Sequence, residues 1–332
     1  MIVDVHAHMV PRTIFAAVKR AARDFPSVIM QESEGGYRFA FAGGEMTRPV
    51  SPRLIDPETR VAWMKKQGIT HQIVGGWLDL FGYELPVGEG LCWSRLLNEH
   101  LLSGAKSTTG LTALASVPLQ DGQLAAEVLN EALDAGFAGV MIGTQPKGVG
   151  GNLDYTSLAP FWEAASRRNA IVFIHPMYVC GDDRLADYDM VNAVGRATDT
   201  TVAVARLLYS GHIMKYPGTK IVVSHGGAAL PYLLGRLARN HAVHPDKVAD
   251  PVEGFKRMYY DTVLFDPASL RFLVEKVGVA RVMLGSDYPF PIGDPEPCKV
   301  VHGSGFNEVD LRSILSDNAA RLFQVSGCGC GS

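Results

Sequence analysis

Eight short, largely β-branched apolar runs recur along this 332-residue chain, separated by segments with helical apolar spacing. The runs are nearly continuous in apolar residues, which is typical of parallel strands buried on both faces. They span residues 2–6, 69–75, 111–117, 139–143, 170–175, 220–225, 258–263 and 281–285. The segments with helical spacing span residues 89–106, 121–135, 157–169, 200–216, 230–241, 267–277 and 307–325, and one more helix begins at Asp56-Pro57. Eight strands alternating with eight helices predict an α/β fold of the (β/α)₈ TIM barrel type.

A doubly wound open sheet is the alternative fold. The chain carries no Gly-x-Gly-x-x-Gly fingerprint after its first strand and no Walker lysine motif, so the barrel is favoured. One segment departs from the alternation: residues 37–42, a turn at Gly43-Gly44, and residues 45–48 predict a small β-hairpin after the first strand. The expectation is a single barrel over residues 1–325, with an insertion at about 30–50 over its C-terminal mouth. Residues 326–332 are expected to form a flexible tail.

Composition excludes several classes of partner. Lys and Arg number 31 and Asp and Glu 34, a net charge of −3, so no basic surplus exists to bind nucleic acid. Polar residues interrupt the first dozen positions, and no apolar run is long enough for a membrane span, so neither a secretory signal nor a membrane segment is expected. Five scattered cysteines, an odd number, favour reduced thiols and a cytoplasmic location.

Metal-binding residue types stand at the ends of four predicted strands. His6-Ala-His8 ends the first, His175 the fifth and His225 the sixth, and Asp287 follows the eighth. Active sites of barrels lie at the C-terminal ends of the strands, so these side chains are expected to meet. Two residues apart on an extended strand, His6 and His8 should point the same way.

Three imidazoles and one carboxylate, from His6, His8, His175 and Asp287, make a ligand set that suits Zn²⁺, with manganese, iron or cobalt as alternatives. Taken singly, each histidine also fits a hydrogen-bonded structural role. His225 is left over, and its ordinary pKa suits a general acid or base. A fifth ligand, or a residue that orients bound water, is the other interpretation of His225.

The fourth strand bears on the number of metals. It ends in Met141-Ile-Gly-Thr144, and Lys147 follows in a glycine-rich loop. No carboxylate there is placed to bridge two ions, and Lys147 is interpreted as a solvated loop charge. The sequence therefore predicts one metal per chain.

Five motifs together resemble the mononuclear decarboxylase branch of the amidohydrolase superfamily, the branch that includes aminocarboxymuconate semialdehyde decarboxylase. They are Asp4-Val-His-Ala-His, Gly139-Val-Met-Ile-Gly-Thr, Phe173-Ile-His-Pro, Ser224-His-Gly-Gly and Leu284-Gly-Ser-Asp-Tyr-Pro-Phe-Pro, and the likeness runs from residue 2 to about 323. The resemblance implies that the four ligands hold a catalytic zinc and that His225 is the acid/base residue. It implies non-oxidative loss of CO₂ from a muconate-semialdehyde-type or hydroxylated aromatic acid, without an organic cofactor, and a homodimer. Whether His225 or Asp287 delivers the proton to carbon stays open.

The substrate pocket departs from that branch. Where those enzymes carry an arginine before the Trp-Asp-Pro segment this chain has Ser51, and Arg53 or Arg48 is the substitute. Arg236 matches a carboxylate-binding position of the family, and His244 stands where a further arginine is expected. Arg53, Arg236 and His244 are therefore the candidate substrate-binding residues. Because histidine does not grip a carboxylate at two points as arginine does, a related acid with different ring substituents is expected.

Two other functions stay open at this level. A hydrolase or hydratase of a small amide, lactone or unsaturated acid would use the same metal site with a water nucleophile. A barrel that binds ligands around a structural metal would have no catalytic use for His225.

Overall fold

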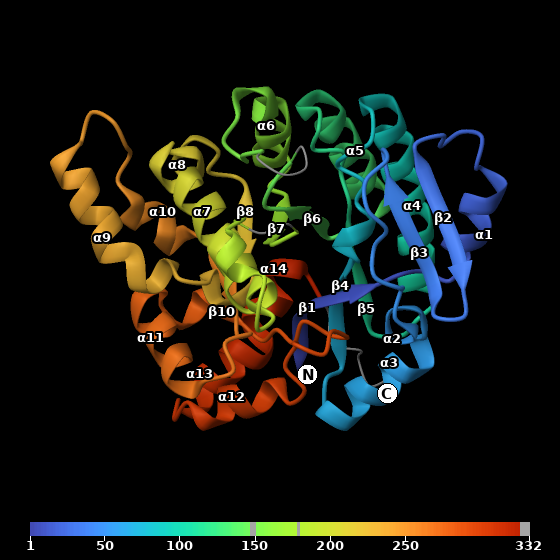
Figure 1. Ribbon diagram of the computed structural model, residues 1–332. Coiled ribbons are helices and arrows are strands. Elements are labelled where there is room, and N and C mark those ends of the chain that lie inside the picture. Colours follow the sequence, from blue (N-terminus) through green and yellow to red (C-terminus); the bar gives the residue numbers. More distant parts are fainter. Residues whose placement is uncertain (147–150, 178–179, 326–332) are drawn as a thin grey trace.

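In the computed structural model, which describes residues 1–146, 151–177 and 180–325, parallel strands form one eight-stranded sheet. Its order is β1 (Val3–Met9), β4 (His71–Gly76), β5 (Leu111–Ala115), β6 (Gly139–Gly143), β7 (Ile171–His175), β8 (Lys220–Val223), β9 (Tyr259–Asp261) and β10 (Val282–Met283). The end of the sheet returns to its beginning, since Val5 N donates to Leu284 O over 2.8 Å and Ala7 bridges Tyr288 in parallel. The predicted (β/α)₈ barrel is confirmed, with helices around the strands (Figure 1).

Three helices of the outer layer begin at aspartate N-cap residues, which can be recognised in the sequence. Asp56, Asp121 and Asp266 each accept a backbone N–H of the turn that follows, which satisfies an otherwise unpaired donor. The helices are α1 (Thr13–Arg20), α2 (Pro52–Ile55), α3 (Pro57–Gln67), α4 (Val87–Lys106), α5 (Gly122–Ala135), α6 (Ala159–Arg167), α7 (Arg196–Tyr209), α8 (His212–Lys215), α9 (Leu230–Val243), α10 (Pro251–Arg257), α11 (Pro267–Val277), α12 (Pro297–Gly303), α13 (Glu308–Arg312) and α14 (Asn318–Phe323).

Several element boundaries differ from the sequence prediction. The first strand continues to Met9, so His8 lies inside β1 rather than after it. The helix expected over 200–216 begins four residues earlier and is broken at Gly211, whose φ of +73° ends α7 before α8 begins. The helix expected over 307–325 is interrupted by a π-turn at Ser313–Asp317. The apolar periodicity continues through such local breaks, so the sequence pattern did not predict them.

The insertion after β1 forms the predicted hairpin, but the predicted pairing was wrong. β2 (Val28–Ser33) pairs antiparallel with β3 (Gly36–Phe41), so the turn lies at Glu34-Gly35 and not at Gly43-Gly44. Phe39 and Phe41 fix this register, because both pack with Trp93 of α4 in a small core of their own. β2 is largely exposed and therefore shows little apolar alternation. Figure 1 shows the hairpin beside α1, on the flank opposite α9.

Other predictions fall partly outside the described residues. The tail 326–332, with Cys328 and Cys330, lies there, as does Lys147. Within the described chain the cysteines Cys92, Cys180 and Cys298 are free thiols. None of the helices described is both long and apolar enough to cross a membrane.

Candidate metal centre

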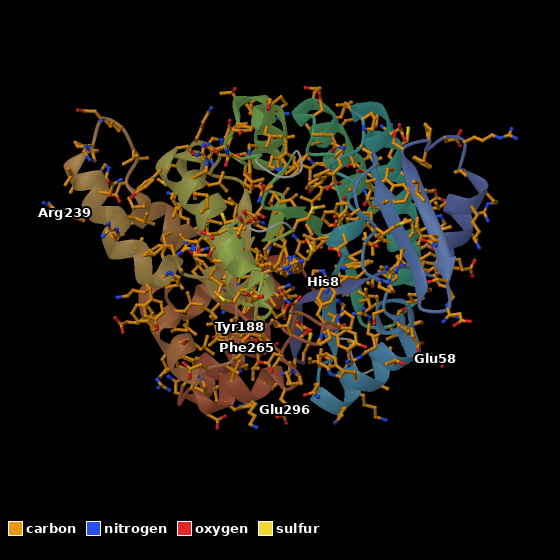
Figure 2. The ribbon with its side chains drawn as sticks, in the orientation of Figure 1. His8, Glu58, Tyr188, Arg239, Phe265 and Glu296 are labelled. Carbon is orange, nitrogen blue, oxygen red and sulfur yellow. The ribbon has the colours of Figure 1, made fainter. Side chains whose placement is uncertain are left out.

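The first two candidate ligands come from the inward face of β1. His6 and His8 alternate with Val5, Ala7 and Met9, and all five side chains are buried. Their ring centroids lie 5.2 Å apart, as expected of residues two apart on one face of a strand. Figure 2 places His8 near the centre of the molecule. The prediction that both rings point the same way is confirmed.

Asp287 reaches the same point because the closing segment is tied to β1. Asp287 N donates to His6 O and His8 N donates to Tyr288 O, both over 2.8 Å. Asp287 has a left-handed φ of +58°, and His225 has one of +54°. Non-glycine residues rarely hold this conformation unless the surrounding structure imposes it, and such positions cluster at functional sites.

The four histidines surround the carboxylate of Asp287. Its Oδ1 lies 3.0 Å from His8 Nε2, 3.2 Å from His6 Nε2 and 3.7 Å from His175 Nε2, and its Oδ2 lies 3.6 Å from His225 Nε2. The donor atoms of His6, His175, His225 and Asp287 all lie within 4.8 Å of one another. The structure thus brings together every residue expected at the metal site.

The other ring nitrogen of three histidines is held by an oxygen acceptor. His6 Nδ1 contacts Asp261 Oδ2 at 2.6 Å, and His175 Nδ1 contacts Pro176 O at 2.9 Å. His8 Nδ1 lies 3.2 Å from the carbonyl oxygen of residue 76. A hydrogen on each Nδ1 leaves the Nε2 lone pairs directed toward Asp287, the arrangement that metal-binding histidines adopt.

Charge in the cluster explains how its groups titrate. Burial disfavours a charged His6, but the carboxylates of Asp287 and Asp261 outweigh burial and raise the pKa of His6 to about 10. For His8 and His175 burial dominates over Asp287 and lowers the pKa of each ring. Burial would raise the pKa of Asp287, but the surrounding imidazoles hold it well below its usual range. The two buried carboxylates, Asp261 and Asp287, therefore favour a positive charge within the cluster.

The residues present fit a divalent metal. Nε2 of His6 and Nε2 of His175 are buried and have no hydrogen-bond partner among the described residues. Such atoms are costly in a folded protein unless an ion or water meets them. A dication would meet both nitrogens and balance the charges of Asp261 and Asp287. Imidazole and carboxylate donors suit Zn²⁺ and Mn²⁺.

His225 differs from the other histidines in its exposure. Its side chain is 24% exposed, whereas those of His6 and His8 are fully buried and that of His175 is 6% exposed. It follows β8 in a tight turn with Gly226, where a Cβ would lie 2.5 Å from Leu264 Cδ2. The turn therefore presents the ring at the open side of the cluster.

The sequence analysis missed the buried residues that hold the candidate ligands in place. Asp261 ends β9 fully buried, and its Oδ1 accepts Gly226 N at 2.9 Å while Oδ2 contacts His6. Asp4, below His6 on β1, accepts Ser286 Oγ and Gln72 Nε2, and burial raises its pKa to about 6. A lone acidic residue inside an apolar strand was the available signal in both cases, since a buried carboxylate needs partners.

The three candidate substrate residues lie in two different places. Arg53 of α2 is exposed and lies over the ring of Tyr288, 5.4 Å from its centroid. The same ring packs against Arg60 and Trp63 of α3, on the outer side of β1. Arg236 and His244 are exposed, one on α9 and one at its C-terminal end. Figure 2 shows Arg239 of the same helix at the edge of the molecule, away from His8. No contact found within the described chain brings any of the three to the cluster.

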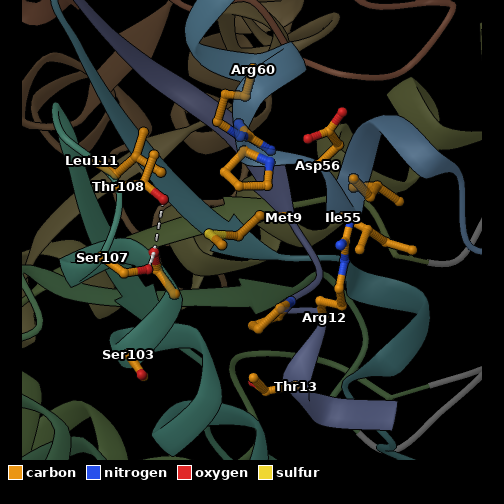
Figure 3. Close-up of a pocket in the computed structure, with 14 residues that line it drawn as sticks. Met9, Arg12, Thr13, Ile55, Asp56, Arg60, Ser103, Ser107, Thr108 and Leu111 are labelled. Carbon is orange, nitrogen blue, oxygen red and sulfur yellow. Dashed lines mark hydrogen bonds between the residues drawn. The ribbon is translucent and has the colours of Figure 1, made fainter.

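Two cavities flank the centre. One of about 180 Å³ opens at the barrel mouth and is lined by Phe41, Gly44, Glu45, Thr47, Asp79, Glu84 and Met177. Another of about 240 Å³ lies on the outer side of β1, where Met9 faces α2, α3 and α4 (Figure 3). Arg60 lines this outer cavity and donates through Nη2 to the carbonyl of His8. Because Met9 points away from His6 and His8, this cavity is separated from the cluster by the barrel wall.

Comparison with known proteins agrees with this geometry. The amidohydrolase family profile matches residues 3–325. A 2-amino-3-carboxymuconate-6-semialdehyde decarboxylase of Dictyostelium discoideum is 26% identical, over 96% of this chain and 90% of its own. A gamma-resorcylate decarboxylase of a Polaromonas species is 26% identical over 82% and 89%. A 5-carboxyvanillate decarboxylase of Novosphingobium aromaticivorans, solved with manganese and 4-hydroxy-3-methoxy-5-nitrobenzoic acid, superposes with a TM-score of 0.79 at 20% identity over 98% and 96%.

Proposed function

We propose, from the premise that this chain belongs to the amidohydrolase family, that it is a metal-dependent decarboxylase. It releases CO₂ without an oxidant from a hydroxylated aromatic, heteroaromatic or muconate-semialdehyde-type carboxylic acid, which makes it a carbon–carbon lyase. The observation that carries the proposal is the cluster of four histidines around Asp287 at the barrel mouth, since relatives that align over most of this chain are decarboxylases of such acids.

We assign one divalent metal per chain to His6, His8, His175 and Asp287, with Zn²⁺ first and Mn²⁺ as the alternative. When bound, the metal would supply a Lewis acid for an oxygen of the substrate or of water. The unpartnered Nε2 atoms and the charge of the cluster support this assignment. No oxidant is required, because the electrons of the broken bond stay on the substrate carbon, and the family resemblance implies that no organic cofactor takes part.

The protein must then deliver a proton. When the bond to the carboxylate breaks, its electron pair remains on carbon, CO₂ leaves, and a proton takes the vacated position. We propose His225 as the donor, because it is the most exposed histidine of the cluster and lies 3.6 Å from Asp287 Oδ2. Asp287 is the alternative, with His225 then returning the proton to it.

Arg53 is proposed for the substrate's carboxylate through the family resemblance. Arg236 and His244 stay proposed through the resemblance alone. The family likeness also supports a homodimer, and the scattered cysteines support a cytoplasmic location. A monomer in analytical sedimentation would contradict the proposed homodimer.

Carbon dioxide release tests the proposal. Metal-loaded protein is incubated with hydroxybenzoates, hydroxypicolinates and carboxymuconates, and dissolved CO₂ and organic product are both measured. Equimolar CO₂ and decarboxylated product are expected from at least one acid. Product without CO₂ would instead identify a hydrolase or hydratase. Unchanged turnover in His225→Ala would remove the catalytic role of His225.

A further inference from the structure

A half-buried arginine beside the metal centre has no counter-ion among the described residues. Arg196, the first residue of α7, donates from Nη1 to Pro176 O at 3.1 Å and to Met177 O at 3.3 Å. These carbonyls follow the end of β7, directly after His175. Arg196 therefore lies at the face of the barrel that carries the cluster.

Each carboxylate near Arg196 is already engaged by another group. Asp199 accepts Thr144 Oγ1 and Gln145 Nε2, the latter at 2.8 Å. Asp79 Oδ2 lies 3.5 Å from Arg48 Nη2, and Asp287 belongs to the metal cluster. Within the described chain, no carboxylate oxygen lies within 4 Å of a nitrogen of Arg196.

The environment of Arg196 is costly for a cation without a partner. Burial lowers its pKa, and the acids that oppose this shift, Asp79, Asp287 and Asp199, act from beyond ion-pair distance while Arg48 adds a like charge. Leaving a charge partly buried and unpaired is destabilising, so such an arginine is expected to be completed by a bound anion. A guanidinium has five N–H donors, and the hydrogen bonds found within the described chain come from Nη1.

Charge also indicates on which side of Arg196 the anion binds. The cavity of about 180 Å³ beside Met177 carries Asp79, Glu45 and Glu84, which repel an anion. On the other side lies the metal cluster, where a dication would offset Asp287. The anion is therefore expected on the side of Arg196 that faces the cluster.

We propose that Arg196 binds a second carboxylate of the substrate, remote from the one released as CO₂, and so selects acids with two anionic groups. This inference rests on the proposed decarboxylase function in one respect only, that the bound acid is a substrate. As a binding statement it can be tested without turnover. Arg196 is distinct from Arg53, Arg236 and His244, which the sequence pointed to.

A matched pair of ligands tests the proposal by calorimetry with metal-loaded protein. 4-Hydroxy-3-methoxy-5-nitrobenzoic acid carries a nitro group in place of the leaving carboxylate and keeps one remote carboxylate. 2-Methoxy-6-nitrophenol is the same molecule without that carboxylate. A charge-assisted, two-point contact predicts that the wild type prefers the acid by about 30-fold or more.

Arg196→Met should reduce this preference to less than about threefold, and Arg196→Lys, which keeps the charge but not the fork, should fall between. Arg206→Met is the matched control, because Arg206 lies on the same helix and pairs with Asp154 instead. It should bind both ligands like the wild type. Metal content and thermal unfolding are measured for each variant.

Three results would overturn the proposal: no preference in the wild type, an undiminished preference in Arg196→Met, or an equal loss of affinity for both ligands. The last would mean that Arg196 only holds the carbonyls after His175. If Arg196→Met loses its metal, Arg196→Lys decides, and an unchanged preference there counts against the proposal. Absence of CO₂ release from every acid would refute the decarboxylase function while leaving this binding result intact.

Discussion

Replacing Asp261 with asparagine should weaken metal binding although Asp261 is not itself a ligand. Its Oδ1 accepts Gly226 N at 2.9 Å and Val263 N at 3.1 Å, and its Oδ2 lies 2.6 Å from His6 Nδ1. An asparagine keeps its carbonyl oxygen where the two backbone donors are. Its NH₂ group must then face His6 Nδ1.

That exchange reverses the polarity of the contact. The amide donates to Nδ1, so the hydrogen of the neutral imidazole moves to Nε2, the atom directed at Asp287 and the metal. Binding a metal then requires Nδ1–H to face an N–H, a buried mismatch that costs about 1–3 kcal/mol. The affinity for Zn²⁺ or Mn²⁺ should fall by about 10- to 100-fold, as for other partners of metal-bound histidines.

Competition with a chromophoric chelator measures the loss. Asp266→Asn is the control, because it makes the same chemical change five residues along the chain, at an exposed cap of α11 where asparagine also caps well. The control should bind metal like the wild type. An Asp261→Asn protein with an affinity within twofold of the wild type would refute the argument that Asp261 sets the hydrogen position on His6.

Further predictions concern the ligands, the proton donor, the metal and the hairpin. Elemental analysis should find one equivalent of metal in the wild type and almost none in His6→Ala or Asp287→Ala; two equivalents, or metal retained by both variants, would contradict the ligand set. His225→Ala should keep its metal but release CO₂ about 10²-fold more slowly or worse, the scale of a positioned acid or base; a smaller loss would favour another donor. Chelation should abolish CO₂ release and added Zn²⁺ or Mn²⁺ should restore it, and full activity in metal-free protein would contradict a metal role. Phe39→Ala should lower the free energy of unfolding by about 3–5 kcal/mol in a urea titration, since Phe39 is fully buried, whereas the exposed Ile29→Ala should cost under about 1 kcal/mol; equal losses would contradict the account of the hairpin core.

The barrel and the meeting of its strand-end side chains could be predicted because they depend on short-range patterns. Buried parallel strands need continuous apolar runs, and Asp or Pro marks the beginning of a helix, so each element is visible within about ten residues. Barrel topology then places all strand ends on one face. That rule alone brings His6, His175 and Asp287 together without knowledge of any side-chain contact.

The prediction from sequence failed where the apolar pattern of a segment does not reflect its place in the fold. β2 is paired but mostly exposed, so it lacks the alternation that marks a half-buried strand, and the turn was assigned to Gly43-Gly44 instead. The exposure of Arg236 could not be predicted either. An arginine on an amphipathic helix gives the same sequence pattern whether the helix covers the barrel mouth or lies at the side of the barrel.

By itself, then, the sequence determined the barrel, its strand ends and the chemical kind of site, since each is encoded locally. Only the tertiary structure decided which charges are paired. Asp261 meets His6 across 255 positions of sequence, and Arg196 stands without a counter-ion among the described residues because Asp79, Asp199 and Asp287 are engaged elsewhere. Pairing of charges depends on distance in the folded state and on loss of water, and neither is fixed until the barrel closes between β10 and β1.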